Sequence, residues 1–237
     1  MTKFATQPLY LQVRDALAQQ IAHNTWTAGN AIPNETDLAR EWGVSPGTMR
    51  KALDLLEGEG LVSRRQGRGT FVNDPAASKM AVRYSRICIR TGERIVGDIK
   101  IVEVAEGAAT DVERTRLRLQ EGDRVCRIDR TRSYEGKAYL NEHATLPYTL
   151  FPGLAGTERH SLGIVALARA YGVLLGEAVE HVSLGVASRS SAEALQVVEG
   201  AAVLVLDRLI MARDGRPAEW RTAQCSMADM WYEAETT

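Results

Sequence analysis

Two groups of side chains in this sequence have the types and spacing needed to bind charged partners. The first group follows a sharp turn and consists of small and basic residues, Ser45, Gly47, Thr48, Arg50 and Lys51. They fall on the exposed side of the first turns of an expected helix. Small and basic groups at a helix N-terminus suit the phosphates and base edges of a DNA major groove. This stretch therefore predicts a helix that contacts DNA.

The second group is a pair of arginines on one expected strand. Arg130 and Arg132 are separated by one residue, so both side chains point to the same face of the strand. Two guanidiniums on one face repel each other unless an anion or a carboxylate lies between them. Two interpretations stay open: Glu142 or Asp129 neutralises the pair for structural reasons, or the pair binds a ligand carboxylate or phosphate. We favour the ligand.

Length and composition set the remaining limits. The 237 residues exceed a usual small domain, so two domains are expected. A hydrophobic content of 45% and a charged content of 25% are ordinary for a globular protein. No apolar run approaches the roughly 20 residues of a membrane helix. The first residues also lack the apolar core of a signal peptide. We therefore expect a cytoplasmic protein.

The cysteines and histidines indicate neither a disulfide framework nor a metal site. The three cysteines, Cys88, Cys126 and Cys225, are odd in number and scattered, so we expect buried thiols. The four histidines show no metal-ligand spacing. Nothing in the chain resembles a nucleophile and its base. We expect no catalytic residues, no metal and no cofactor.

The charges are balanced along the chain. The net charge of −1 argues against nonspecific coating of nucleic acid by the whole surface. Residues 1–78 hold eight Lys and Arg and eight Asp and Glu, so this part is also neutral. Any DNA affinity must therefore come from the placement of a few cations.

The elements around the first group form a helix-turn-helix. Residues 8–23 carry apolar side chains at helical spacing, and Asn34 with Asp37 is typical of a cap at the start of a second helix. Gly43 allows the sharp turn that follows. Ser45 then caps the third helix, with a proline at its first position.

A hairpin is expected directly after the third helix. Residues 61–65 and 70–72 are rich in β-forming side chains, and residues 66–69 contain the glycines of a turn. Three arginines crowd this hairpin, and we expect no acid near them: Arg64, Arg65 and Arg68. On an isolated hairpin they would form a solvated edge. Next to a recognition helix, we favour contact with a groove and phosphates.

The rest of the chain mixes strands and helices after a polar linker. Residues 73–85 are small and polar, which indicates the linker. Strands are expected at residues 87–90, 99–104, 125–133, 137–146, 179–187, 202–212 and 217–226. Helices are expected from a cap at Thr110, from Ser161 or Leu162, and from a cap at Ser190 with Glu193.

An internal repeat joins two parts of this second region. The segment LQEGDRVCRIDR, Leu119–Arg130, matches VVEGAAVLVLDR, Val197–Arg208, at an offset of 78 residues. Each copy is followed by a hairpin. The repeat predicts two related halves around one antiparallel sheet, with a groove where the halves meet.

The N-terminal motifs carry a resemblance to a known family. The runs PLYLQVRDALAQQI and AIPNETDLAREWGVSPGTMRKALDLLEGEGLVSRRQGRGTFV resemble the N-terminal domain of the GntR family of bacterial transcription regulators. The resemblance implies a winged helix fold, dimeric operator binding and a response to an effector. Pro46 stands where the family usually has an arginine, so one expected contact is missing. With Lys51 and Arg65 from the patterns above, the DNA-contact candidates are Thr36, Ser45, Gly47, Thr48, Arg50, Lys51, Arg65, Gln66, Gly67 and Arg68.

Residues 85–230 are similar to the effector-binding domain of the HutC subfamily, called UTRA, which shares the chorismate lyase fold. The similarity lies in the motifs RTR at Arg130–Arg132, YLNE at Tyr139–Glu142, FPGL at Phe151–Leu154 and GRPAE at Gly215–Glu219. The family's usual second Arg-x-Asp is absent from Cys225–Met230. By the resemblance, the residues that line the ligand site are Arg130, Arg132, Glu142, Ser161 and Glu219.

These patterns predict a mixed α/β chain of the α+β type. A winged helix-turn-helix occupies residues 1–74, a linker residues 75–85, and an antiparallel-sheet UTRA domain of chorismate lyase-like fold residues 86–237. The expected function is a sequence-specific DNA-binding transcription regulator, a repressor controlled by a small anionic metabolite. The expected partners are double-stranded operator DNA, the anionic effector and a second copy of the chain, with no membrane. The resemblance implies a location in the bacterial cytoplasm, with the nucleoid when the protein is bound to DNA.

Two other classes of function were weighed against the regulator. One is an enzyme on the lyase-like fold with a DNA-binding appendage, for which turnover of a ligand would be the discriminating observation. The other is a structural nucleoid protein that binds DNA without regard to metabolites or sequence. The basic residues are too few and too localised for that class.

Overall fold

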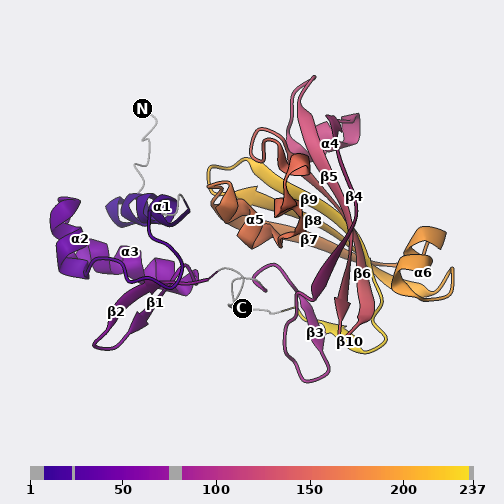
Figure 1. Cartoon of the computed structure of the whole chain (residues 1–237), viewed down its shortest axis with the longest axis horizontal. Coiled ribbons are helices and arrows are strands. Elements are labelled where there is room, and N and C mark those ends of the chain that lie inside the picture. The colour runs from indigo at the N-terminus through magenta and orange to yellow at the C-terminus, as the bar shows by residue number, and fades with distance from the viewer. Residues whose placement is uncertain (1–7, 23–24, 75–81, 235–237) are drawn as a thin grey trace, which may run out of the picture. The chain divides into compact units, whose positions relative to one another are not determined.

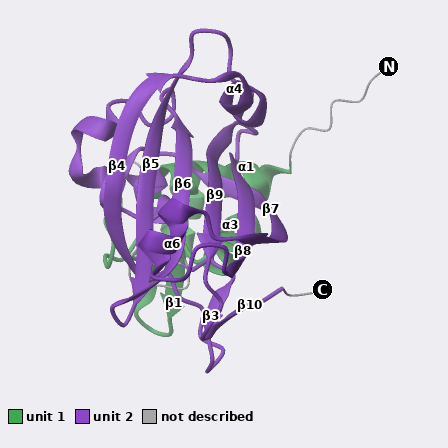
Figure 2. Cartoon of the chain, turned by 90° about the vertical axis from the view of Figure 1, so that its right-hand side faces the viewer, with its two compact units in different colours: residues 1–81 green, residues 82–237 purple. Residues whose placement is uncertain are grey.

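The chain forms two compact units in the computed structural model, which describes residues 8–22, 25–74 and 82–234. The units are residues Met1–Ala81 and Val82–Thr237 (Figure 2). Most of the expected linker, residues 75–81, lies outside the described residues. The last part of that expected linker, Val82 to Ser85, belongs to the second unit, where Tyr84 is buried.

The first unit has three helices and a two-stranded hairpin (Figure 1). Its elements are α1 Leu9–Ala22, α2 Glu35–Glu41, α3 Pro46–Gly58, β1 Val62–Arg65 and β2 Gly69–Val72. The core lies where these elements meet and includes the fully buried side chains of Leu17, Leu38, Met49, Leu53 and Leu56. The predicted winged helix-turn-helix is confirmed.

Local capping sets the start of each helix in the predicted helix-turn-helix. The Asn34 side chain accepts a hydrogen bond from the Asp37 N–H at 2.9 Å and caps α2. Gly43 has a φ of +63° in the turn, a conformation that side chains with a Cβ rarely adopt. Ser45 Oγ accepts from the Thr48 N–H at 3.1 Å, and Pro46 is the first residue of α3. These caps fix where the exposed N-terminal turn of α3 begins.

The second unit is built on a six-stranded antiparallel sheet with the order β4-β5-β6-β9-β8-β7. The strands are β4 Asp98–Ala108, β5 Arg124–Tyr134, β6 Lys137–Pro147, β7 Leu175–Val186, β8 Ala202–Ala212 and β9 Pro217–Cys225. A separate pair joins β3 Ile87–Ile89 to β10 Met230–Tyr232. The sequence did not predict β10, a strand of three residues.

The internal repeat corresponds to two halves of this sheet. One half runs β4, α4 Asp111–Leu117, β5, β6, and the other runs β7, α6 Arg189–Leu195, β8, β9, with β6 and β9 adjacent at the centre. The helices end alike, because Arg118 and Gln196 both adopt a left-handed conformation, with φ of 52° and 56°. The expectation of two related halves around one antiparallel sheet is confirmed.

Helices and short segments cover both faces of the sheet. On one face lie the 3-10 helices η1 Leu154–Gly156 and η2 Glu158–Ser161, α5 Ile164–Ala170, and the β3–β10 pair (Figure 1). On the other face, α4 contacts β9 and α6 contacts β6. No helix among the described residues is long and apolar enough to span a membrane. The three cysteines are free and buried, so the predicted buried thiols are confirmed.

Several predicted boundaries are wrong. Ser188, not Ser190, caps α6, since its Oγ accepts from the Ser191 N–H at 3.2 Å. Three nearby serines, Ser188, Ser190 and Ser191, made this choice ambiguous in the sequence. The middle helix α5 begins at Ile164, after η2 has used Ser161 as its last residue. Strand β7 begins at Leu175, before the expected residue 179, because its pairing with β8 continues past an irregularity.

Candidate functional site

The structure places the DNA-contact candidates of the helix-turn-helix at the exposed start of α3 and on neighbouring α2. Thr36, Ser45, Gly47, Arg50 and Lys51 are exposed, and Thr48 is half-buried with its hydroxyl 2.9 Å from that of Ser45. The Nζ of Lys51 lies over the ring of Tyr10 in α1, 4.0 Å from its centre. The N-terminal turn of α3 is therefore open to a partner.

Arg50 is held in place by an acid of the preceding helix. Its Nη2 lies 2.8 Å from Oε1 of Glu35 in α2, and its Nε donates to Oε2 of the same carboxylate at 3.3 Å. The hydrogen bond that Arg50 donates to Glu35, and then the charge of Glu35, raises the pKa of Arg50. The Arg50 side chain is still 66% exposed, so it remains accessible while its direction is set.

The arginines of the wing differ in their surroundings. The expectation that no acid lies near them is wrong for Arg64, which forms ion pairs with Asp54 and Glu57 of α3. The Arg65 guanidinium lies over the ring of Phe71, 4.4 Å from its centre. Arg68 is exposed at the turn, with no side-chain partner among the residues that the structure describes. Gln66 and Gly67, the other wing candidates, are exposed in the same turn.

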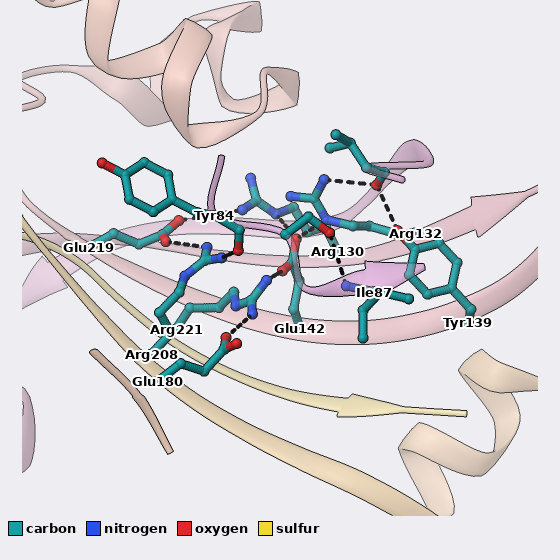
Figure 3. Close-up of polar contacts among 12 residues, drawn as sticks. Tyr84, Ile87, Arg130, Arg132, Tyr139, Glu142, Glu180, Arg208, Glu219 and Arg221 are labelled. Carbon is teal, nitrogen blue, oxygen red and sulfur yellow. Dashed lines mark hydrogen bonds and ion pairs between the residues drawn. The ribbon is translucent and has the colours of Figure 1, made fainter. Parts of the chain in front are cut away.

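In the second unit, a buried cluster of arginines and glutamates lies on the face of the sheet that η2 covers (Figure 3). Nε of Arg130 and Nε of Arg132 both donate to Oε1 of Glu142, at 2.5 and 2.7 Å. Nη1 of Arg221 donates to the other oxygen of Glu142 at 3.0 Å. The strand register explains the central contact, because Arg130 of β5 is paired directly with Glu142 of β6.

The second half of the sheet contributes the other members of this cluster. Nη2 of Arg208 donates to Oε2 of Glu219 at 2.8 Å, and Nη2 of Arg221 donates to Oε1 of Glu180 at 2.7 Å. Arg208, Arg221 and Glu180 were not among the site residues predicted from the sequence. The repeat could have indicated one of them, because Arg208 is the counterpart of Arg130 at the offset of 78 residues.

The cluster carries more positive than negative charge. Among the described residues it joins four arginines, Arg130, Arg132, Arg208 and Arg221, to three glutamates, Glu142, Glu180 and Glu219. The Arg130 side chain is 1% exposed and that of Glu142 is 0% exposed. An excess of one positive charge is thus held away from water.

Several polar atoms of the cluster have no hydrogen-bond partner among the described residues. They are Nη2 of Arg130, Nε of Arg208, Nε of Arg221 and Oε1 of Glu219. Nη2 of Arg130 and Oε1 of Glu219 lie 3.6 Å apart, within ion-pair distance but too far for a good hydrogen bond. Unsatisfied buried donors and acceptors are costly, so a further polar group that bonded to these atoms would stabilise the cluster.

The electrostatic environment keeps the central acid ionised. Burial alone would raise the pKa of Glu142, but the guanidiniums of Arg130, Arg132, Arg221 and Arg208 outweigh it and hold that pKa well below its usual range. Burial, and then the charge of Arg221, lowers the pKa of Arg208.

The structure brings four of the five expected ligand-site side chains together. Ser161 differs: it is exposed at the end of η2, and its hydroxyl donates to the Glu158 carbonyl at 2.6 Å. The neighbouring carbonyl of Leu162 accepts a hydrogen bond from Nη1 of Arg130 at 3.4 Å. Ser161 therefore directly precedes a residue that contacts the cluster, but its own hydroxyl is bonded to Glu158 and not to the cluster.

Of the two acids considered as neutralising partners, only Glu142 contacts the arginine pair. Asp129 lies on the opposite face of the sheet, where its carboxylate pairs with His143. The interpretation of Asp129 as a partner of Arg130 and Arg132 is therefore wrong. Glu142 lies between the guanidiniums of Arg130 and Arg132, as expected if the pair is neutralised for structural reasons. One positive charge of the cluster is still not neutralised by its glutamates.

Comparison with known proteins agrees with this architecture. The family model described as "UTRA domain" matches residues 95–228, and the one described as "Bacterial regulatory proteins, gntR family" matches residues 9–72. The chain belongs to the GntR family of bacterial regulators, in the group that carries a UTRA domain, and the expected membership is confirmed.

Individual relatives are regulators of transcription. The chain is 31% identical over 151 residues to the mannosyl-D-glycerate transport/metabolism system repressor MngR of Escherichia coli (strain K12), covering 62% of each chain. It is 32% identical over 119 residues to the histidine utilization repressor of Pseudomonas putida, covering 50% of this chain and 48% of that one. The chain thus spans less than two thirds of the length of these curated relatives.

A solved structure supports the fold. The possible transcriptional regulator YydK from Bacillus subtilis subsp. subtilis str. 168 has a TM-score of 0.59 and 18% identity, covering 98% of this chain and all of that one. The relatives are named as repressors of transcription, and they give no support to the enzyme alternative.

Proposed function

We propose that this chain is a repressor that binds operator DNA as a homodimer in the bacterial cytoplasm. A small anionic metabolite, a carboxylate or a phosphate, binds at the cluster of Arg130, Arg132, Glu142 and Glu219 and releases the DNA. The observation that carries the effector proposal is the excess of buried positive charge, four arginines against three glutamates among the described residues.

The excess charge defines what the ligand must supply. A buried cation is costly unless an anion and hydrogen bonds compensate it. Nη2 of Arg130, which has no hydrogen-bond partner among the described residues, can donate to a ligand carboxylate or phosphate. Oε1 of Glu219, which also accepts no hydrogen bond from the described residues, can accept one from a hydroxyl or amine of the same ligand, since it lies 3.6 Å from Nη2 of Arg130. An acid that also carries a hydroxyl or amine fits both.

Glu142 competes with any ligand anion for the two arginines. Its Oε1 already accepts hydrogen bonds from both Arg130 and Arg132. A ligand anion must therefore share the two guanidiniums with Glu142 or take its place on one of them. The ligand shifts the protein towards the form that releases DNA only if it binds that form more tightly.

The dimer follows from the small number of cations that can contact DNA. Each chain has one recognition helix, α3, whose exposed basic side chains are Arg50 and Lys51. A single winged helix with so few cations binds weakly. Two copies would reach half-sites about one helical turn apart, which matches a two-fold operator.

The test is a thermal-shift screen of organic and phosphorylated acids on the full-length protein. A compound that raises the melting temperature is then added to a mobility-shift assay on the DNA upstream of the protein's own gene. We expect the compound to release wild-type protein and the control Arg189→Ala, whose side chain is 82% exposed on α6. Arg132→Lys, which keeps the charge but not the planar fork, should respond only at a higher concentration. Equal release of Arg132→Lys, Arg130→Ala/Arg132→Ala and wild-type protein at the original concentration would show that the site is wrong.

A further inference from the structure

The buried cluster also holds the backbone of the segment that begins the second unit. Nη1 of Arg208 donates to the carbonyl of Tyr84 at 2.6 Å, and Nη1 of Arg132 donates to the carbonyl of Val96 at 3.1 Å. Each of these arginines uses another nitrogen on a glutamate of the cluster. The segment Val82–Val96, which we call the entry segment, is thus fixed near both of its ends by arginines of the candidate effector site.

Further contacts hold the side chain of Tyr84, which lies near the start of the entry segment. Tyr84 is 9% exposed, and its hydroxyl donates to the carbonyl of Gly176 in β7 at 2.7 Å. The Arg208 guanidinium lies 5.9 Å from the centre of the Tyr84 ring. Figure 3 shows Tyr84 beside Glu219 and Arg208 at one side of the cluster, with Tyr139 at the other.

The position of the entry segment in the chain gives these contacts a role. It follows residue 81, where the unit that contains the recognition helix ends. Every covalent path from the candidate effector site to the DNA-binding unit passes through it. A change at Tyr84 is therefore a change at the start of that path.

We propose that Arg208 is the positioning residue that couples effector binding to the entry segment, an inference that rests on the proposed anion site. Glu219 is shared, with Oε2 on Arg208 and Oε1 facing Arg130. An anion bound at Arg130 places a second negative group beside Glu219. Charged acceptors hold a guanidinium more strongly than a neutral carbonyl does. The Arg208 guanidinium is then drawn towards the acids, and its hydrogen bond to the Tyr84 carbonyl is lost.

The test is hydrogen exchange measured by mass spectrometry on the full-length protein, with inorganic phosphate as the probe. The Ser85 N–H bonds to the Val82 carbonyl and the Ile95 N–H to the Ile87 carbonyl, so their exchange reports opening of the entry segment. We expect phosphate to speed exchange there by roughly two- to tenfold in wild-type protein, the effect of one lost hydrogen bond. Peptides from α1 should not change.

Variants of Arg208 separate this inference from the proposed anion site. In Arg208→Met, and to a lesser extent in Arg208→Lys, exchange of the entry segment should already be fast without phosphate and should not rise further with it. Arg208→Lys keeps a cation beside Glu219, so it serves if Arg208→Met does not fold. The Arg189→Ala control should behave as wild type.

The outcomes distinguish two kinds of failure. If phosphate raises the melting temperature but leaves exchange of the entry segment unchanged, the anion site stands and the coupling role of Arg208 is wrong. The same conclusion follows if either Arg208 variant exchanges like wild type. If phosphate does not bind but both variants exchange fast, Arg208 holds the entry segment, and the proposed phosphate site is at fault.

Discussion

At the scale of single residues, this protein places its charged side chains in two opposite environments. Arg50 is exposed and directed by one acid, whereas Arg130 is buried and shares its acid with two other arginines. Burial makes the contacts of Arg130 strong and their loss costly, while exposure leaves Arg50 free for a partner. We therefore expect changes in the buried cluster to lower the stability of the fold, and changes at Arg50 to lower DNA binding.

Loss of the central acid should destabilise the second unit. Glu142→Gln keeps the shape of the side chain but leaves Arg130, Arg132 and Arg221 without their shared negative charge. We expect a loss of about 3–5 kcal/mol, the usual cost of breaking a buried ion pair. Urea unfolding at neutral pH measures it, with Glu193→Gln on α6 as the exposed control. Equal stability of the two variants would contradict the account of the cluster.

Loss of Arg50 should weaken operator binding without unfolding the protein. The side chain lies on the exposed face of α3, where a base or phosphate can replace Glu35 as its partner. Arg50→Ala should lower operator affinity by roughly tenfold or more and relax the choice of sequence. Fluorescence anisotropy on operator and scrambled DNA measures both effects. Arg40→Ala is the control, since Arg40 is 77% exposed and pairs with Asp37 of its own helix. An unchanged affinity in a folded Arg50→Ala protein would remove Arg50 from the interface.

At the scale of elements, local signals in the sequence decide how much could be predicted. The helix-turn-helix was predictable because Ser45, Pro46 and Gly43 act on their immediate neighbours. Strand β10 was not predictable, because its three residues form a strand only by pairing with β3 far away in the sequence. The same holds for the site: Arg130 and Arg132 share a strand, but Arg221 reaches Glu142 through the pairing of β6 with β9.

The wing hairpin should contribute to DNA affinity through charge. Arg68 is exposed at the turn between β1 and β2, whereas Arg64 is already engaged with Asp54 and Glu57. If Arg68 contacts a phosphate, Arg68→Ala should reduce the slope of log K against log salt by about 0.9. Arg64→Ala should leave that slope unchanged. Binding measured over a range of salt concentrations checks both, and equal slopes for wild type and Arg68→Ala would place the wing away from the phosphates.

Helix α4 has a cap that should make the second unit sensitive to acid. Burial would raise the pKa of Glu113, but hydrogen bonds from Arg127 and from Thr110 outweigh it and lower that pKa to about 2. A lowered pKa stabilises the fold above the ordinary value of 4.5, and this stability is lost as the pH falls towards 2. Glu113→Gln should therefore show a weaker decline between these pH values. Urea midpoints at several pH values test this, with Asp111→Asn, at a 91% exposed side chain, as the control. Parallel declines in wild type and Glu113→Gln would contradict it.

At the scale of the whole molecule, a DNA-binding unit and a two-half sheet are joined in one chain. The proposed homodimer should protect two half-sites about one helical turn apart in a footprinting experiment. Sedimentation of the free protein should give the mass of two chains. A monomer that protects one asymmetric half-site would rule out the two-fold arrangement. A variant with weakened operator binding, such as Arg50→Ala, should still sediment as a dimer.

The two halves of the sheet have the same topology but differ in which charged residues are paired across their strands. Arg130 is paired across the strands with Glu142, whereas its counterpart Arg208 is paired with Arg221. The second half therefore holds two like charges side by side, and Arg221 is neutralised partly by Glu142 of the first half. If the halves arose from one duplicated segment, their divergence has made them mutually dependent. The first half alone holds two arginines against one glutamate, and its Glu142 also binds Arg221 of the second half. The cluster therefore ties the two halves into one domain, while their shared strand order keeps the symmetry of the backbone.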